Sequence, residues 1–198
     1  MGLSKQAKTL NEKQSKLVIS YLNTTDRPQR NMVIFLLSLK AGLRAKEISC
    51  LKWSMVMGAD GDIGEFINLP NVASKGNSGR TIPLNKTLKD NLVQLLNKVQ
   101  LVNDNVSDQF IITTQRSPKT SAQVIVNMFS HWYEECGLIG CSSHSGRRSF
   151  ITNCSRMISS VGGSLRDVQS LAGHSNLNTT QRYIDGDEKS KIKVVDII

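Results

Sequence analysis

The chain has 198 residues, and its 25 basic against 16 acidic side chains give a formal charge of +9. Hydrophobic residues make up 39% of the chain, which suits the core of one domain and argues against wholesale disorder. No apolar stretch approaches the roughly 20 residues that span a bilayer, and without an apolar segment at the N-terminus, secretion by a signal peptide is not expected. The four cysteines form no CxxC pair, so we expect free thiols of a reducing compartment, not a disulfide frame or a zinc site.

The positive charge is concentrated in three segments. Residues 1–30 carry six basic and two acidic groups, residues 71–90 carry four and one, and residues 144–183 carry five and one. Concentrated basic charge is the usual footprint of a polyanion, nucleic acid first, although a solvated basic surface has the same composition. Aromatic residues are only 5% of the chain, so stacking of bases on an aromatic platform is not the expected mode of binding.

Three helices are predicted between residues 11 and 51. Residues 11–23 have the apolar spacing of a short amphipathic helix, and residues 29–41 are apolar nearly all round, as in a buried helix. Asp26 is expected to cap this second helix, and Gly42 to end it in a left-handed conformation. A third helix is expected over residues 44–51.

The middle of the chain changes character. Residues 65–69 and 80–84 are predicted to be short strands of a β-hairpin, because a segment rich in turn-forming residues separates them. Leucines at spacings of three and four predict a helix over 86–102, and a further helix is expected over 120–135. The short apolar run at 110–112 is predicted to be one more strand.

The last third of the chain is predicted to hold three short helices. Ser143 is expected to cap a helix over 144–158. A serine–aspartate capping box opens the next helix, which Gly173 closes, and Asn176 or Asn178 caps a last helix. The predicted fold class is therefore mainly α with a small antiparallel β-sheet, an α+β arrangement.

Five groups of polar residues stand out as candidates for chemistry. They are Arg44 with Glu47, Lys75, His144 with Arg147, His174, and Tyr183 on the last predicted helix. Taken singly, they also fit a surface ion pair, a solvated hairpin lysine, a solvated helix start, a structural histidine and a core tyrosine. His144 and Arg147 would lie one turn apart in the first turn of a helix, where the helix dipole favours an anion.

Together and in this order, these residues resemble the tyrosine recombinase family, which includes phage integrases, Xer-type recombinases and fimbrial inversion recombinases. The family's first-arginine box resembles AGLRAKEISCLKWSMV, its lysine hairpin SKGNSGRTIPL, its His-x-x-Arg box HSGRRSFIT, and its closing box LAGHSNLNTTQRYI. The resemblance covers roughly residues 25–187. Gly146 and Arg148 depart from the pattern, since the family usually has Leu before the second arginine and often His after it.

The resemblance implies a tyrosine recombinase catalytic-domain fold and a site-specific DNA recombinase that needs no metal or other cofactor. Tyr183 would attack the DNA backbone and form a covalent 3′-phosphotyrosine, and strands would be exchanged through a Holliday junction. Arg44 and Arg147 would clamp the non-bridging phosphate oxygens in forked geometry, and His174 would donate a further hydrogen bond to them. The task would be integration, excision, inversion or transposition.

The remaining roles also follow from the resemblance. His144 would assist proton transfer at the nucleophile or orient the site, Lys75 would protonate the departing 5′ oxygen, and Glu47 would orient the first arginine. Five basic residues are expected to contact DNA, namely Lys5, Lys8, Arg80, Arg148 and Arg182.

The expected partners are double-stranded DNA, three further copies of the chain in a synaptic tetramer, and host or directionality factors, but no membrane. The expected location is the cytoplasm, at the nucleoid, or the host cytoplasm if the protein is viral. Residues 1–24 are expected to be a basic arm with a short helix, residues 25–187 the catalytic domain, and residues 188–198 a tail that is exchanged between protomers or packs on its own domain. The family's usual N-terminal core-binding domain is not recognised, so we expect a minimal single-domain member or an excised catalytic piece.

Two alternative functions fit the same residues. A type IB topoisomerase shares the chemistry but relaxes supercoils as a monomer. A catalytically retired DNA-binding accessory factor would keep the fold and the affinity for DNA without cleaving it.

Overall fold

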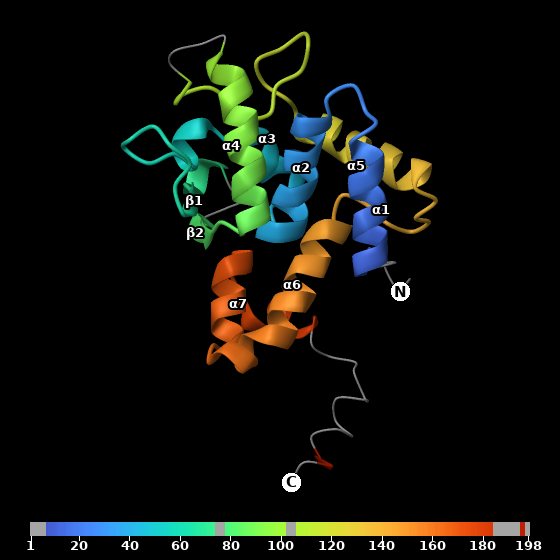
Figure 1. The fold of residues 1–198 in the computed structure, drawn as a ribbon. Helices are drawn as coiled ribbons and strands as arrows, with labels where there is room; N and C mark the ends of the chain where they lie inside the picture. The colour runs from blue at the N-terminus through green and yellow to red at the C-terminus, as the bar shows by residue number, and fades with distance from the viewer. Residues whose placement is uncertain (1–6, 74–77, 102–105, 184–194, 197–198) are drawn as a thin grey trace.

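The computed structural model describes residues 7–73, 78–101, 106–183 and 195–196, which form a mainly helical fold with one small sheet (Figure 1). The predicted fold class is confirmed. Within the described part of the chain, no helix has both the length and the apolar character needed to cross a membrane.

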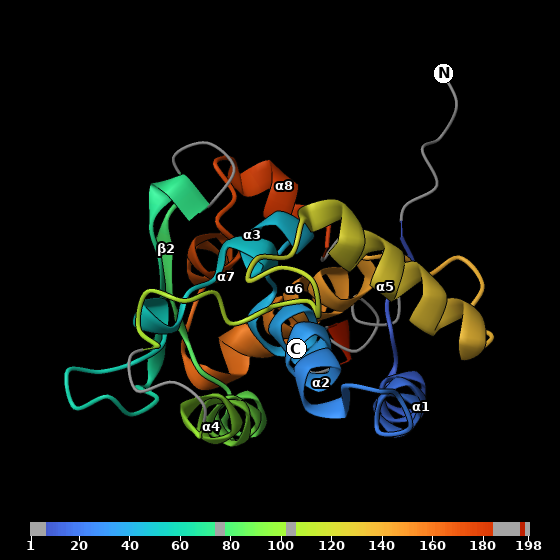
Figure 2. The same cartoon turned by 90° about the horizontal axis from the view of Figure 1, so that it is seen from above.

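Helix α2 (Pro28–Ala41) lies at the centre of the fold, and helices from both halves of the chain pack against it (Figures 1 and 2). Its neighbours are α1 (Glu12–Leu22), α3 (Ala45–Cys50), α4 (Lys86–Gln100) and α6 (Ser145–Met157). Because α2 contacts helices on several sides, nearly all of its side chains are buried, which explains why its sequence is apolar all round.

The two ends of α2 show one wrong and one correct prediction. The helix begins with Pro28, so its N-cap is Arg27 and not Asp26, which stands one residue too early to cap. At the other end, Gly42 adopts the expected left-handed conformation with a φ of 66°. A side chain at this position would also collide with Phe150, because its Cβ would come within 2.4 Å of the phenyl ring.

The predicted hairpin is confirmed as the antiparallel pair of β1 (Phe66–Leu69) and β2 (Arg80–Pro83). Ile67 lies opposite Ile82, and both side chains are buried against the core while their neighbours along the strands are exposed. Within the described part of the chain, this two-stranded pair is the only sheet. It lies beside α4 in Figure 1.

The prediction of a strand at 110–112 is wrong. Phe110 makes only an isolated bridge with Lys52, and the next backbone bond runs from the amide of Ile111 to the carbonyl of Leu51. The apolar run belongs to a connecting segment that leads to α5 (Ala122–Glu135). It is hydrophobic because it is buried, and not because it belongs to a β-sheet.

The C-terminal third holds α6, α7 (Leu165–Ala172) and α8 (Leu177–Gln181), and two predictions about it need correction. Helix α6 has His144 as its N-cap, and Ser143 is buried instead of capping. Helix α8 ends before Tyr183, because the chain tightens into a turn in which the Tyr183 amide bonds back to a carbonyl of the helix.

Three other signals in this part are confirmed. The amide of Ser164 donates to Asp167 Oδ2 at 2.7 Å in the capping box of α7, and Gly173 ends that helix with a φ of 60°. Asn176, and not Asn178, caps α8. Among the residues that the structure describes, short 3-10 turns also occur at Trp53–Met55, Asn71–Ala73 and Ile158–Val161.

Candidate active site

The candidate residues gather where the C-terminal end of α2 meets the start of α3, the start of α6 and the turn between α7 and α8. Helix α6 packs against both α2 and α7, so it joins the main core to a smaller C-terminal cluster of Ile151, Val168 and Ala172. Figure 2 shows α3, α6, α7 and α8 grouped on one side of α4. Segments that are more than a hundred residues apart in the sequence therefore meet in one place.

Arg147 is the central cation of this region, and it projects from the first turn of α6. Its Nη1 donates to the Gly42 carbonyl at 2.5 Å and its Nη2 to the Ala172 carbonyl at 2.6 Å, while only 5% of the residue is exposed. Burial, followed by the charge of Arg44, lowers its pKa to about 9, so the guanidinium is still charged at neutral pH. These two bonds join the first-arginine segment to the end of α7.

Arg44 is the N-cap residue of α3, and Glu47 orients it. The backbone amide of Arg44 donates to Glu47 Oε2 at 2.8 Å and its Nη1 donates to Oε1 at 2.9 Å. The Glu47 side chain is 1% exposed and that of Arg44 is 26% exposed. The pair is therefore a buried carboxylate holding a partly open guanidinium, which is not the surface ion pair that the spacing alone also allowed.

A second arginine holds the same carboxylate. Arg80, the first residue of β2, donates from Nη1 to Glu47 Oε1 at 2.9 Å and from Nη2 to Oε2 at 3.2 Å. Burial alone would raise the pKa of Glu47, but the hydrogen bond and charge of Arg80, with those of Arg44, outweigh it and the pKa is lowered. The sequence suggested Arg80 as a DNA contact, whereas its side chain is only 4% exposed.

His174 lies just after the left-handed turn that ends α7. Its Nδ1 is 2.9 Å from the hydroxyl of Thr180, and its ring stacks on that of Tyr183 with centroids 6.0 Å apart. Burial, followed by the positive charges of Arg147, Arg44 and Arg80, lowers the pKa of His174 to about 4. The imidazole is therefore neutral at pH 7, with one ring nitrogen engaged and the other available for a partner.

Tyr183 lies among basic side chains from several elements. The guanidinium of Arg148 is 5.7 Å from the centre of its ring. Tyr183 also lines a pocket of about 400 Å³ together with His144, Arg147 and Arg182. His144 is exposed at the start of α6 and makes no side-chain capping bond.

A second pocket adjoins the first, because Thr179 lines both. It has a volume of about 900 Å³, and its walls include Arg44, Arg80, Arg166 and His174. We call these two pockets together the carboxyl-end site, after their place at the C-terminal end of α2. Arg44, His144, Arg147, His174 and Tyr183 are all brought together there.

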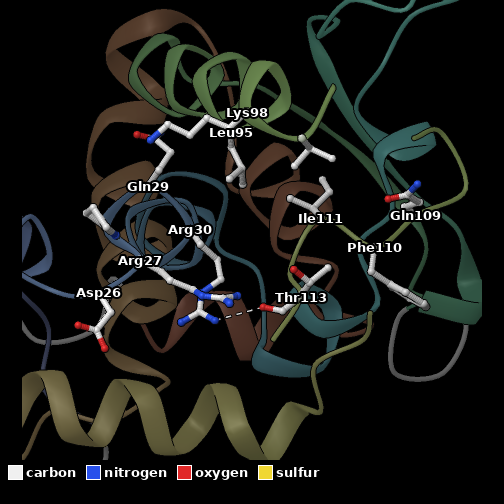
Figure 3. A pocket seen from close by; sticks show the side chains of 12 residues that line it. Asp26, Arg27, Gln29, Arg30, Leu95, Lys98, Gln109, Phe110, Ile111 and Thr113 are labelled. Atoms are coloured by element: carbon white, nitrogen blue, oxygen red, sulfur yellow. Dashed lines mark hydrogen bonds between the residues drawn. The ribbon is translucent and has the colours of Figure 1, made fainter. Parts of the chain in front are cut away.

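Other hollows of comparable size lie at the opposite end of α2 (Figure 3). Two pockets of about 620 and 560 Å³ share Asp26, Arg27 and Arg30, and we call them the amino-end hollow. Arg30 donates to the carbonyl of Thr113 at 3.1 Å and to the side chain of Asn31. Among the residues that the structure describes, no candidate catalytic residue lines this hollow.

The remaining sequence candidates are placed as follows. Lys5 and Lys75 lie outside the described residues, the latter in the segment that joins β1 to β2. Lys8 is exposed and lines a shallow pocket together with Arg148, and Arg182 is exposed beside Tyr183. Within the described part of the chain, no three His, Cys, Asp or Glu side chains are grouped to hold a metal ion.

Sequence reasoning missed Thr180 and the role of Arg80. Thr180 is fully buried and contacts His174, but its only sequence signal is that it comes three residues before Tyr183. Arg80 and Glu47 are 33 positions apart in the sequence, so no local sequence pattern predicts their pairing.

Comparison with known proteins places the chain in a family. Residues 8–190 match the model of the phage integrase family. The chain is 33% identical over 144 residues to tyrosine recombinase XerC of Yersinia pestis, an alignment that covers 72% of this chain and 43% of that protein. It is 29% identical over 178 residues to tyrosine recombinase XerA of Thermococcus onnurineus, covering 89% and 57%.

Solved structures agree on the fold. The crystal structure of XerA recombinase superposes with a TM-score of 0.73 at 22% identity, covering 98% of this chain and 64% of that one. XerH site-specific recombinase bound to its difH substrate gives a TM-score of 0.72 at 19% identity, covering 100% and 56%. The chain spans about half the length of the curated relatives it matches. It belongs to the phage integrase family and has the fold of tyrosine recombinase catalytic domains.

Proposed function

We propose that this chain supplies the catalytic domain of a site-specific DNA recombinase, which cuts and rejoins DNA through a 3′-phosphotyrosine on Tyr183. The observation that carries the proposal is the meeting of a tyrosine, two arginines and a neutral histidine at the carboxyl-end site. Membership of the phage integrase family supports the same chemistry.

The two arginines would stabilise the charge that gathers on the phosphate in the transition state. Arg147 keeps N–H groups beyond the two that bond to the carbonyls of Gly42 and Ala172, since a guanidinium has five. Arg44 is partly open and lines the pocket. Two forked cations that are held in advance lower the barrier without any rearrangement during the reaction.

Tyr183 would be the nucleophile. Its phenolic oxygen attacks the phosphorus, the bond to the 5′ oxygen breaks, and the phosphodiester is kept as a phosphotyrosine whose energy serves for rejoining. A free phenol is mostly protonated at neutral pH, so its proton must pass to an acceptor. His144 lines the same pocket and would assist this transfer.

His174 would act as a hydrogen-bond donor and not as an acid. Because its pKa is lowered to about 4, it carries a single ring proton at neutral pH. If the Thr180 hydroxyl donates to Nδ1, the proton is on Nε2 and is available to a non-bridging phosphate oxygen. Lys75 would then give its proton to the departing 5′ oxygen, a role that rests on the family resemblance.

The wider reaction cycle is also part of the proposal. Four protomers would hold two duplexes and exchange strands through a Holliday junction, with double-stranded DNA as partner, in the cytoplasm. Three exposed or half-buried cations are suited to phosphates that flank the cut: Arg148 and Arg182 line the same pocket as Tyr183, and Lys8 lines a neighbouring pocket with Arg148.

The test is covalent capture on DNA. A library of nicked suicide duplexes with random sequence around the nick is incubated with the full chain, and complexes are isolated under denaturing conditions. We expect covalent complexes whose DNA shares a sequence. They persist because the short strand between the cut and the nick diffuses away, so its 5′ hydroxyl cannot rejoin the DNA.

The same experiment separates the alternatives. Covalent capture without a shared sequence, together with relaxation of a supercoiled plasmid by the monomer, would indicate a type IB topoisomerase. Salt-sensitive DNA binding without any capture would indicate a retired accessory factor and would overturn the proposal.

A further inference from the structure

We propose that Arg80 is a positioning residue that sets Arg44 and the turn before His174 from inside the protein, and that it does not contact DNA. This inference rests on the proposed function, because it assigns a task within that active site. Its evidence is the set of partners that surround one guanidinium.

The hydrogen-bonding capacity of Arg80 is almost fully used by the protein. Its Nε donates to the Leu171 carbonyl at 2.8 Å, and Nη1 reaches both Glu47 Oε1 at 2.9 Å and the Ser78 carbonyl at 3.3 Å. Its Nη2 donates to Glu47 Oε2 at 3.2 Å. With its side chain 4% exposed, little of the fork remains for a phosphate.

The first group that Arg80 positions is Arg44. Both guanidiniums donate to Glu47 Oε1, each at 2.9 Å, so the two cations share one buried carboxylate. If Arg44 were the sole cation for Glu47, the buried charge would draw Arg44 inward and away from the pocket. Arg80 balances that charge, which leaves the Arg44 guanidinium aligned by Glu47 and still open toward a phosphate.

The second group is the turn that carries His174. Arg80 bonds to the carbonyl of Leu171 in the last turn of α7, and a side chain at Gly173 would come within 2.9 Å of Arg80 Nη1. Gly173 is therefore needed twice, for its left-handed φ of 60° and for the space that the guanidinium fills. Arg80 thus lies directly beneath the turn that presents the histidine.

These contacts connect three segments that the sequence keeps far apart. Arg80 begins β2, Glu47 lies in α3, and Leu171 lies in α7, with separations of 33 and 91 residues. A displacement of either contact would move a catalytic group by a fraction of an ångström. Such displacements act on the rate of the bound complex more than on binding, since DNA does not touch the residue that moves.

The test compares Arg80→Gln with the wild-type chain on the suicide duplex whose sequence is recovered from trapped ends. We expect the single-turnover rate of capture at saturating DNA to fall about a hundredfold, with an unchanged Kd for the intact duplex. In an Arg44→Lys background, Arg80→Gln should reduce the capture rate far less, because both substitutions disturb the same cluster of Arg80, Glu47 and Arg44.

Arg30→Gln is the matched control, because Arg30 is also partly buried and also bonds to a carbonyl and a side-chain oxygen, but at the other end of α2. It should lower the melting temperature without slowing capture. An Arg80→Gln variant that binds DNA more weakly but captures at the normal rate would show a direct DNA contact and overturn the inference. The inference would also be overturned if Arg30→Gln slowed capture as much as Arg80→Gln does. The same holds if the rate reductions caused by Arg80→Gln and Arg44→Lys simply multiplied in the double variant.

A thermal unfolding cycle separates this inference from the proposed function. Arg80→Gln, Glu47→Gln and the double variant should show strong coupling, since removing both partners leaves no unpaired buried charge. Additive effects would overturn the inference even in an active recombinase. If the wild-type chain captures no DNA, the proposed function fails, and the positioning role fails with it even where the unfolding cycle shows coupling.

Discussion

Arginines line a hollow at each end of helix α2, but the groups that hold these arginines differ between the two ends. The helix has 14 residues, so the two hollows are roughly 20 Å apart. At the amino-end hollow, the Arg30 guanidinium donates to the neutral carbonyl oxygen of Thr113 (Figure 3) and to the neutral side-chain oxygen of Asn31. Both ends also contain tyrosine and histidine, namely Tyr21 and His131 at the amino-end hollow, and Tyr183, His144 and His174 at the carboxyl-end site.

The two ends therefore differ in the partners of their arginines. The carboxyl-end site also has a buried carboxylate, Glu47, that aligns one arginine, and two carbonyls that align the other. Glu47 and the Gly42 carbonyl come from the N-terminal third of the chain, whereas the Ala172 carbonyl comes from the C-terminal third. Paired substitutions at the two ends of α2 therefore test whether the reaction depends on this convergence.

The largest difference is expected between the two tyrosines. Tyr183→Phe should abolish covalent capture and leave DNA binding intact, because the lost hydroxyl is the reacting group. Tyr21→Phe, at the amino-end hollow, removes only a hydroxyl that lies 3.4 Å from His131 and should capture DNA normally. Denaturing gels with the suicide duplex measure both. Persistent capture by Tyr183→Phe would remove that residue from the role of nucleophile.

The next difference is expected between two arginines. Arg44→Lys should slow capture by about 10²–10³-fold, because a point charge cannot replace the fork on the phosphate. Arg27→Lys at the amino-end hollow should have no effect on the rate. Single-turnover kinetics at saturating DNA measure the two variants, and near-normal capture by Arg44→Lys would contradict the arginine clamp.

A smaller effect is expected from the hydroxyl that contacts His174. Thr180→Val keeps the shape of the side chain but removes the bond to Nδ1, so the imidazole loses its orientation and capture should slow about tenfold. Thr25→Val removes comparable bonds to the Leu22 carbonyl and Asn31, and should lower stability alone. Equal rates for the two variants at saturating DNA would argue against the orienting role of Thr180.

The smallest effect is a pH dependence of stability. The folded pKa of His174, about 4, is below its ordinary value of 6.5, so the unfolded chain binds this proton more tightly. Stability should therefore be fully present above pH 6.5 and should fall as the pH is lowered toward 4. Glu47, whose pKa is also lowered, adds a loss in the same direction at more acidic pH.

Melting temperatures between pH 7 and pH 4 check this expectation. His174→Asn should flatten the profile of the wild-type chain, because the titrating group is gone. His131→Asn, which changes an exposed histidine at the amino-end hollow, should leave the profile as it is. A wild-type profile that His174→Asn does not alter would place the acid sensitivity elsewhere.

Most of the secondary structure was predictable because its signals are local. The left-handed Gly42 and Gly173, the capping box at Ser164 and the hairpin strands all follow from residues within a few positions of one another. The errors came where local signals compete. Asp26 is a typical capping residue, but Pro28 takes the first helical position and makes Arg27 the N-cap, and the apolar run at 110–112 is buried without joining a sheet.

The sequence by itself determined which polar residues exist, their order, and the helix ends on which most of them lie. Only the tertiary structure decided their partners: Arg147 bonds to a carbonyl 105 residues away, and Arg80 bonds to Glu47, 33 residues away. The physical reason is that α3 and α6 pack against the buried helix α2, while α7 packs against α6. Once water is excluded there, each buried charge must find its counterpart among whatever side chains that packing supplies.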